Sequence, residues 1–224
     1  MQFHKVAIKN YFFVLLFILF QFLISCKNTK YQNAMEYSRE TIAAKKVEIN
    51  QQDQKIQLTL IFDSSDLSVH EYPASVGLIT FYDSARQKIK EDKVLQIEIK
   101  IKDINNENTY LYAVDQIELY KNILEKAGTI TEFFINQNTI QLENYVDKNQ
   151  ISVDDLNGLF DYSQLLQKEA RVENYSVDGF LILPDNQKMQ VKISLIQPNL
   201  DNKLTIQFDL KNGLMTYLGV NDDL

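Results

Sequence analysis

Apolar and polar residues alternate in several stretches of the chain, which is the pattern of strands that bury one face. The clearest is 95–102, where Leu95 begins a series of alternate apolar positions, and a polar loop separates it from a second strand over 109–114. A similar strand over 56–62 has 47–50 as its expected hairpin partner. Near the C-terminus, the alternation predicts a three-stranded meander over 174–183, 188–197 and 203–210.

Other stretches place apolar residues three or four positions apart, as helices with one buried face do. Asn33–Glu36 and Ser152–Asp155 have the composition of helix N-terminal caps. Gly128 is expected to end one helix and to be followed by a strand over 130–135. The pattern predicts helices over 34–46, 74–90, 117–127, 139–147 and 153–171.

These elements predict an α+β fold. Its antiparallel sheets, formed by the N-terminal hairpin strands and the C-terminal meander, are packed by amphipathic helices. A single domain over 33–224 is the simplest organisation. A helix followed by antiparallel strands occurs twice, which leaves a division into two lobes, at about 33–128 and 129–224, as an alternative. The two segments share no convincing residue identities, so no repeat is established.

The first residues have a different character. Residues 1–10 contain Lys5 and Lys9 and no acid, and residues 11–24 are almost wholly apolar. A basic segment before a short apolar run is typical of a signal peptide. The run is shorter than the roughly 20 residues that span a bilayer.

The apolar run ends in Leu23-Ile24-Ser25-Cys26, which resembles the lipobox of bacterial lipoproteins. The resemblance covers residues 1–26 only. It implies cleavage between Ser25 and Cys26, removal of residues 1–25 and a diacylglyceryl thioether on Cys26. Residues 26–32 would then be a short tether that holds the domain at the membrane. No Asp of the kind that retains some lipoproteins in the inner membrane follows Cys26, so the outer membrane facing the periplasm is expected in a Gram-negative cell.

Charge narrows the range of partners. The chain has 23 Lys and Arg against 30 Asp and Glu, a net charge of −7. Removal of Lys5 and Lys9 leaves 21 − 30 = −9. Arg occurs only at Arg39, Arg86 and Arg171. An acidic chain this poor in Arg does not suit binding to a nucleic-acid backbone, so no nucleic-acid partner is expected.

The chain offers few residues for metal or nucleophilic chemistry. Cys26 is its only cysteine, and His70 is the only histidine beyond the expected signal peptide. No metal or cofactor is therefore expected, and no catalytic residue is assigned. His70 is interpreted as a surface residue. The loop acids Asp103 and Glu107 faintly resemble a calcium loop but fit a solvated turn better, because the turn Gly and the distal Glu are missing.

Two further features have a structural and a functional interpretation. Asp154 and Asp155 are a pair of carboxylates, but they also suit the first turn of a helix, which favours acids. The abundant tyrosines either fill a core that contains no Trp or line a groove for a peptide, glycan or lipid tail. Those considered for such a groove are Tyr110, Tyr112, Tyr120, Tyr145, Tyr162 and Tyr175.

The sequence therefore predicts a membrane-anchored envelope lipoprotein whose domain binds a partner protein or envelope component without catalysis. Two alternatives stay open. One is a carrier or sensor for an apolar ligand, which needs a deep apolar cavity. The other is a hydrolase that uses carboxylates alone, which needs two acids facing each other across a cleft.

Overall fold

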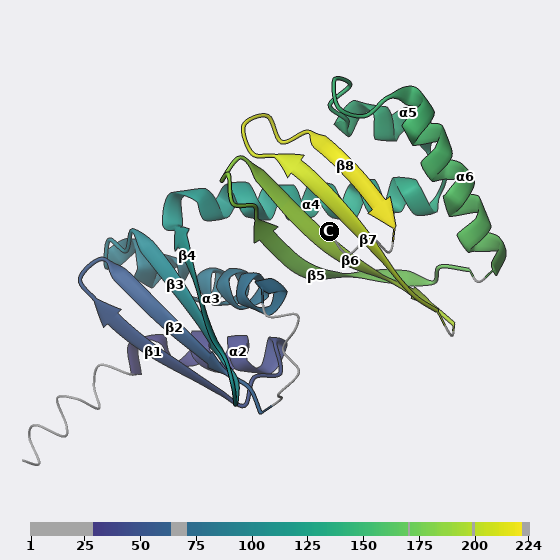
Figure 1. Ribbon diagram of the computed structural model, residues 1–224. Coiled ribbons are helices and arrows are strands. Elements are labelled where there is room, and N and C mark those ends of the chain that lie inside the picture. Colours follow the sequence, from purple (N-terminus) through teal and green to yellow (C-terminus); the bar gives the residue numbers. More distant parts are fainter. Residues whose placement is uncertain (1–28, 64–70, 170, 199, 221–224) are drawn as a thin grey trace, which may run out of the picture.

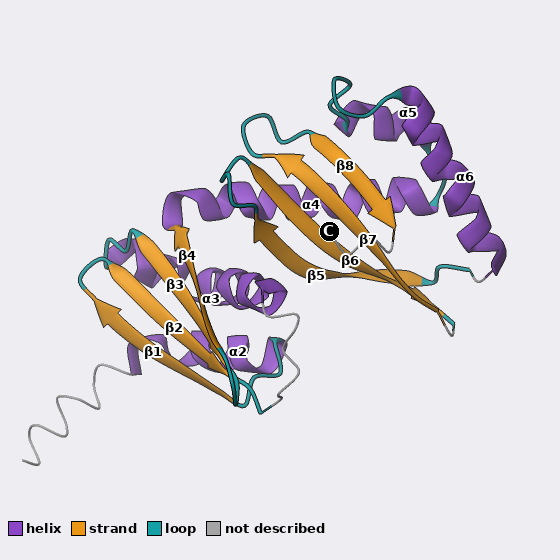
Figure 2. Ribbon diagram, viewed as in Figure 1, coloured by secondary structure: helices purple, strands orange, loops and turns teal. Residues whose placement is uncertain are grey.

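The computed structural model describes residues 29–63, 71–169, 171–198 and 200–220. Two four-stranded sheets lie side by side, each with helices against one face (Figures 1 and 2). The predicted α+β class is confirmed, as are the N-terminal hairpins and the C-terminal meander in outline. One hydrophobic core cluster includes residues from both sheets.

The first sheet has the strand order β1-β2-β3-β4 and combines two antiparallel hairpins. Its central strands β2 and β3 are parallel, because α3 carries the chain across the sheet between them. This parallel pairing was not predicted. The elements of this part are η1 Thr29–Tyr31, α2 Gln32–Thr41, β1 Lys46–Gln52, β2 Lys55–Ile61, α3 Glu71–Glu91, β3 Gln96–Lys102 and β4 Glu107–Ala113.

The two faces of the first sheet follow the predicted alternation, with one correction. Ile97, Ile99 and Ile101 are buried, whereas Lys100 pairs with Glu107 across the polar face. Leu95 was predicted to share the buried face but is 58% exposed. It lies one residue before β3, where its backbone N–H donates to the carbonyl of Gln54 at 2.8 Å.

The second sheet is fully antiparallel, with the order β5-β6-β7-β8. The predicted meander gains β8 as a fourth strand. β7 begins at Leu200, three residues before the start predicted at 203. The elements of this part are η2 Val114–Gln116, α4 Ile117–Ile135, α5 Thr139–Leu142, η3 Glu143–Tyr145, α6 Val153–Glu169, β5 Asn174–Ile182, β6 Lys188–Gln197, β7 Leu200–Asp209 and β8 Met215–Val220.

Helix α4 corrects two predictions. It does not end at Gly128, and residues 130–135 are helical, not a strand. Ile130 and Phe134 continue the buried stripe of this helix, so burial extends it past the glycine. Gly128 has a packing role, since a Cβ there would lie 3.2 Å from the hydroxyl of Tyr175. The predicted lobe boundary at 128 therefore falls within one continuous helix.

Other element boundaries also differ from prediction. The helix predicted over 34–46 ends at Thr41, and its N-cap is Tyr31, which makes no side-chain capping bond. The helix predicted over 139–147 is the short α5 followed by η3. Both predicted segments were correct in position but too long.

The end of the predicted tether over 26–32 already belongs to the folded domain. Tyr31 is only 3% exposed, and its ring lies 5.7 Å from that of Phe81 on α3. Its hydroxyl donates to Asp92 at 2.6 Å, and Lys30 forms an ion pair with the same carboxylate. Burial and this hydrogen bond raise the pKa of Tyr31. Any tether to Cys26 is thus shorter than predicted.

The two sheets are joined through α3 and a cluster of aromatic rings. Phe180 of β5 has its ring 6.1 Å from that of Tyr112 and 5.3 Å from that of Tyr120. The backbone N–H of Phe180 donates to the Ser75 hydroxyl at 2.7 Å. Next to it, Gly179 lies at a bulge in β5 with φ +140°. A Cβ on Gly179 would lie 2.5 Å from the carbonyl oxygen of Tyr72, so α3 and β5 approach as closely as glycine allows.

Candidate binding groove between α6 and β8

Cys26, the predicted lipidation site, and Ser25, which precedes the predicted cleavage, lie outside the described part of the chain. His70, interpreted as a surface residue, lies outside it as well. Cleavage and lipidation therefore stay predictions. None of the helices in the described ranges combines the length and the apolar character needed to cross a bilayer.

The loop that faintly resembled a calcium site is explained by its own hydrogen bonds. Asp103 accepts backbone hydrogen bonds from Asn105, at 2.6 Å, and from Asn106, which fixes the turn. Glu107 points away to Lys100, and that hydrogen bond lowers the pKa of Glu107. Within the described ranges, no group of three or more His, Cys, Asp or Glu side chains has the geometry to hold a metal ion.

The six tyrosines considered for a groove do not converge. Tyr112 and Tyr120 belong to the buried aromatic cluster. Tyr145 packs against Phe133 with 5.8 Å between ring centres. Tyr175 donates to Glu132 at 3.3 Å, and its burial, with this acid beside it, raises its pKa. Most of these rings therefore serve packing, and the core interpretation of the tyrosines describes them better than a shared groove.

The acids at the start of α6 have separate roles. Asp155 accepts hydrogen bonds from both the hydroxyl and the backbone N–H of Ser152, at 2.6 and 2.9 Å. Its own N–H donates to the Ser152 hydroxyl at 3.1 Å, which completes the predicted cap. The Ser152 bonds hold the pKa of Asp155 below its usual value, the opposite of what a general acid needs. Asp154 takes no part in this cap, and both acids line a neighbouring groove.

That groove separates the first half of α6 from β8 and has a volume of about 560 Å³. We call it the α6–β8 groove. Figure 1 shows α6 standing beside the outer edge of β8. Carboxylate, amide and apolar groups are mixed along its walls, which is usual for binding sites. Its lining residues are Gln150, Ile151, Asp154, Asp155, Gly158 and Leu159 on one side and Thr216, Tyr217 and Leu218 on the other.

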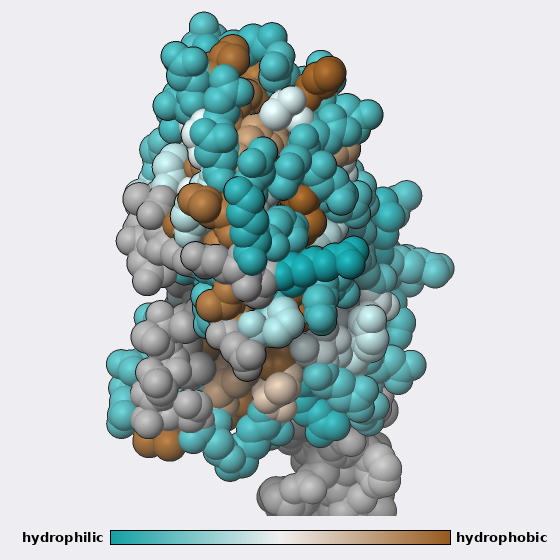
Figure 3. All heavy atoms as spheres, turned by 90° about the vertical axis from the view of Figure 1, so that its right-hand side faces the viewer, coloured by the Kyte–Doolittle hydropathy of each residue, from teal (hydrophilic) through white to brown (hydrophobic). Residues whose placement is uncertain are grey.

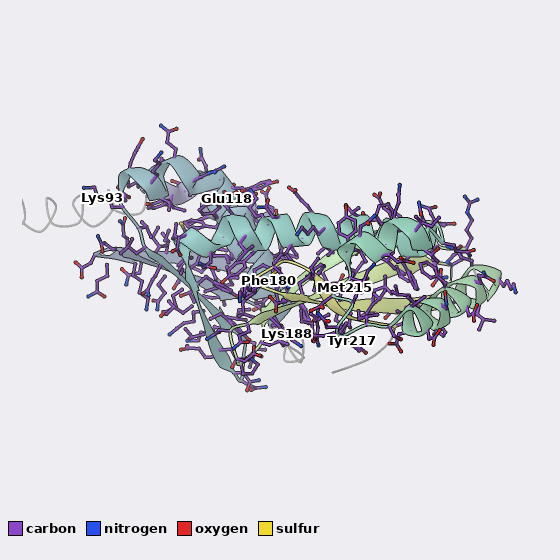
Figure 4. All side chains as sticks on the ribbon, turned by 90° about the horizontal axis from the view of Figure 1, so that it is seen from above. Lys93, Glu118, Phe180, Lys188, Met215 and Tyr217 are labelled. Carbon is purple, nitrogen blue, oxygen red and sulfur yellow. The ribbon has the colours of Figure 1, made fainter. Side chains whose placement is uncertain are left out.

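The β8 wall presents two kinds of side chain. Leu218 pairs with Ile206 and shares the sheet face that packs on α4, whereas Tyr217 points to the opposite face. In Figure 4, Tyr217 and Lys188 lie on the side of the sheet away from α4, and Phe180 and Met215 lie toward the helix. Lys188 reaches the groove and donates to Gln150 at 3.3 Å. An occupant of the groove would therefore meet an apolar side and a polar side.

The α6 wall contains an unexpected glycine. Gly158 lies inside the helix, is exposed, and has no heavy atom within 4 Å of where a Cβ would be. Glycine at such a position destabilises a helix by roughly 0.5–1 kcal/mol relative to alanine. The packing of the described residues gives no reason for it. Its effect is to leave the groove open where a side chain would narrow it.

No family model, curated protein or solved structure matches this chain.

Apolar side chains are exposed around the same end of the molecule. Tyr162 and Leu165, one and two turns beyond Gly158 on α6, are 38% and 53% exposed. Ile140 on α5 and Val153 at the start of α6 are exposed as well. Figure 3 looks at this end and shows apolar side chains emerging among hydrophilic ones. These side chains do not line the groove, but they lie on the helix that forms one of its walls or on the neighbouring α5.

Two other clefts are lined by cationic as well as acidic side chains. One lies between the end of α4 and the start of β5, and includes Glu132, Arg171 and Glu173. The other lies between α4 and the turn before β8, and includes Lys126 and Lys211.

Sequence reasoning missed the α6–β8 groove because β8 itself was not predicted. The signal available was the run Met215–Val220, which is rich in β-forming residues.

Proposed function

We propose that this protein is a lipid-anchored lipoprotein of the cell envelope whose domain binds a partner without catalysis, through the α6–β8 groove. The single observation that carries the choice of site is Gly158, an exposed glycine within a helix that opens a groove instead of packing. The anchor rests on the lipobox pattern that ends at Cys26.

The arrangement of the chain supports this assignment. The first described residues and α2 lie at one end of the molecule, and α6 lies at the other (Figure 1). Tyr31 is packed against α3, so a lipid on Cys26 would hold the first sheet near the membrane. The α6–β8 groove would then face away from the membrane, where an envelope partner can reach it.

The anchor is tested by changing Cys26 to Ser and labelling cells with palmitate. We expect the native protein to incorporate label and to fractionate with membranes, and the Cys26→Ser variant to lose both properties. Label that persists in the variant would contradict the lipoprotein assignment.

The binding site is tested by placing a photo-crosslinking amino acid at Tyr162 in intact cells. The matched control is Leu111, which is 55% exposed on β4 of the other sheet. We expect discrete adducts from position 162 and none from position 111. Adducts that form equally at both positions, or at neither, would contradict binding at this end of the domain.

A further inference from the structure

The sheet edge that borders the α6–β8 groove has the form of an acceptor for another strand. β8 is the last strand in the order of its sheet, and no strand among the described residues follows it. Edge strands present backbone N–H and C=O groups that can pair with a further chain. A groove along such an edge can hold an extended peptide segment. A compact ligand would not pair with the backbone N–H and C=O groups of the edge strand.

The segment that begins at Val146 starts to pair with the outer edge of β8 and then turns away from it. Val146 forms a parallel bridge with Met215, and the N–H of Asp147 donates to the Met215 carbonyl at 2.8 Å. A turn then diverts the chain, since the N–H groups of Gln150 and Ile151 both donate back to the Asp147 carbonyl. Val146 thus occupies the first position of a fifth strand that the following residues do not continue.

The groove continues where that fifth strand would lie. Leu218, Leu159 and Ile151 supply apolar surface on its walls. Gly158 keeps α6 free of a side chain at this point. A strand in this position would alternate its side chains between the α4 side of the sheet and the side of Tyr217.

The acidic residues along the groove indicate the charge of the segment that it would bind. Asp154 and Asp155 line the groove, Asp161 follows on the same helix, and no Lys or Arg belongs to the lining among the described residues. Lys188, at the rim, is hydrogen-bonded to Gln150. The expected mature chain is also acidic overall, at −9, which favours the approach of a basic partner.

We propose that the α6–β8 groove accepts an extended basic segment of a partner protein as a fifth strand on β8. Apolar residues at alternate positions lie against Leu218 and Leu159, and Lys or Arg residues between them meet Asp154 and Asp155. Main-chain hydrogen bonds give affinity, and the alternating side chains give specificity. This inference rests on the proposed function, because it names the kind of partner that the groove binds.

The experiment pans a display library of random peptides of about nine residues against the purified mature protein in detergent. Affinities of the recovered peptides are then measured for the native protein and two variants. Gly158→Phe places a ring in the groove, and Asn157→Phe, at an exposed neighbour on α6 that does not line the groove, is the matched control. Gly158→Phe keeps the helix, because the position has no neighbour within 4 Å.

We expect recovered peptides to alternate apolar residues with Lys or Arg. They should bind the native protein and Asn157→Phe equally, and bind Gly158→Phe at least about tenfold more weakly. N-methylation of alternate peptide amides should weaken binding by a similar factor, since it removes main-chain donors. Asp154→Asn should weaken binding and reduce its dependence on salt.

Three results would overturn the inference: enrichment of acidic peptides, equal affinity for Gly158→Phe, or indifference to N-methylation. Recovery of no peptide, together with crosslinks at 162, would overturn strand addition while leaving the proposed function intact. Absence of crosslinks at 162 would instead remove the proposed function itself.

Discussion

Gly179 and Gly158 lie in two regions that differ in how closely the helix approaches the second sheet. At Gly179, α3 meets β5 so closely that a Cβ would lie 2.5 Å from a backbone oxygen. At Gly158, α6 stands apart from β8, and a Cβ would meet nothing within 4 Å. The first glycine is required by the fold. The second is not, and it lines a groove.

This difference separates a region that gives stability from one that is available for binding. Around Gly179, the Ser75 hydroxyl and the Phe180 ring connect α3 and the first sheet to β5. Around Gly158, α6 carries exposed apolar side chains and acids beside an edge strand. Substitutions at the junction should therefore lower stability, whereas substitutions along the groove should change binding.

The largest expected effect is that of Gly179→Ala. Its φ of +140° is a conformation that L-residues rarely adopt, and the added Cβ overlaps the Tyr72 carbonyl and the Ser75 hydroxyl. We expect a loss of about 4 kcal/mol or more in the free energy of unfolding, measured by urea denaturation. A loss of less than about 1 kcal/mol would show that α3 and β5 are not locked together at this point.

The next largest effect tests the faces of the first sheet. Ile99 is fully buried, so Ile99→Ala should lower the free energy of unfolding by about 2–5 kcal/mol, because lost transfer energy is joined by a cavity. Lys100→Ala is the matched control on the opposite face, where the side chain only pairs with Glu107. Its denaturation midpoint should change little. The reverse ranking of these two variants would mean that the register of β3 is shifted by one residue.

Ile99 and its neighbours also show why much of the fold was predictable from sequence. Alternation over β3, β6 and most of β7 predicts which apolar side chains face the core, and those are buried as predicted, although Gln190 and Thr205 on the polar face are buried as well. The Ser152 cap was predictable for a similar reason, since it depends on residues three positions apart. Patterns of this kind can be recognised from the residues of one short segment, without knowledge of the tertiary structure.

The errors arose where tertiary packing decides the outcome. Gly128 has the appearance of a helix end, but α4 continues because Ile130 and Phe134 are buried. The parallel pairing of β2 with β3 depends on α3 crossing the sheet, which no local pattern records. Even with β8 predicted from its own residues, the α6–β8 groove could not have been located, because it depends on the distance between two elements far apart in the sequence, whose approach is a tertiary property.

A smaller effect is expected at the cap of α6. Ser152→Ala removes the hydroxyl that donates to Asp155 and accepts from its N–H, while the backbone N–H of residue 152 stays, and should lower stability by about 1 kcal/mol. The folded pKa of Asp155 is lowered, so its stabilising contribution is present above pH about 4 and is lost as the pH falls through the folded pKa.

The effects of the Ser152→Ala substitution and of pH on stability can be measured in one set of experiments. Urea midpoints at neutral pH and at pH about 3 should show that Ser152→Ala weakens the loss of stability on acidification. An unchanged acid dependence in this variant would mean that the Ser152–Asp155 pair does not set the stability of the helix start.

The smallest expected effect has the opposite sign. Gly158→Ala should raise the free energy of unfolding by about 0.5–1 kcal/mol, because alanine reduces the freedom of the unfolded chain and the helix has room for its methyl group. Thermal and urea denaturation of the native protein and this variant measure the gain, and Gly179→Ala serves as the contrasting glycine. A stabilising substitution at a groove residue would mean that the glycine is kept at some loss of stability, as expected where an open groove matters more than the helix. Destabilisation by Gly158→Ala would instead show that this glycine has a packing role, and the comparison between the two regions would no longer support a binding groove beside β8.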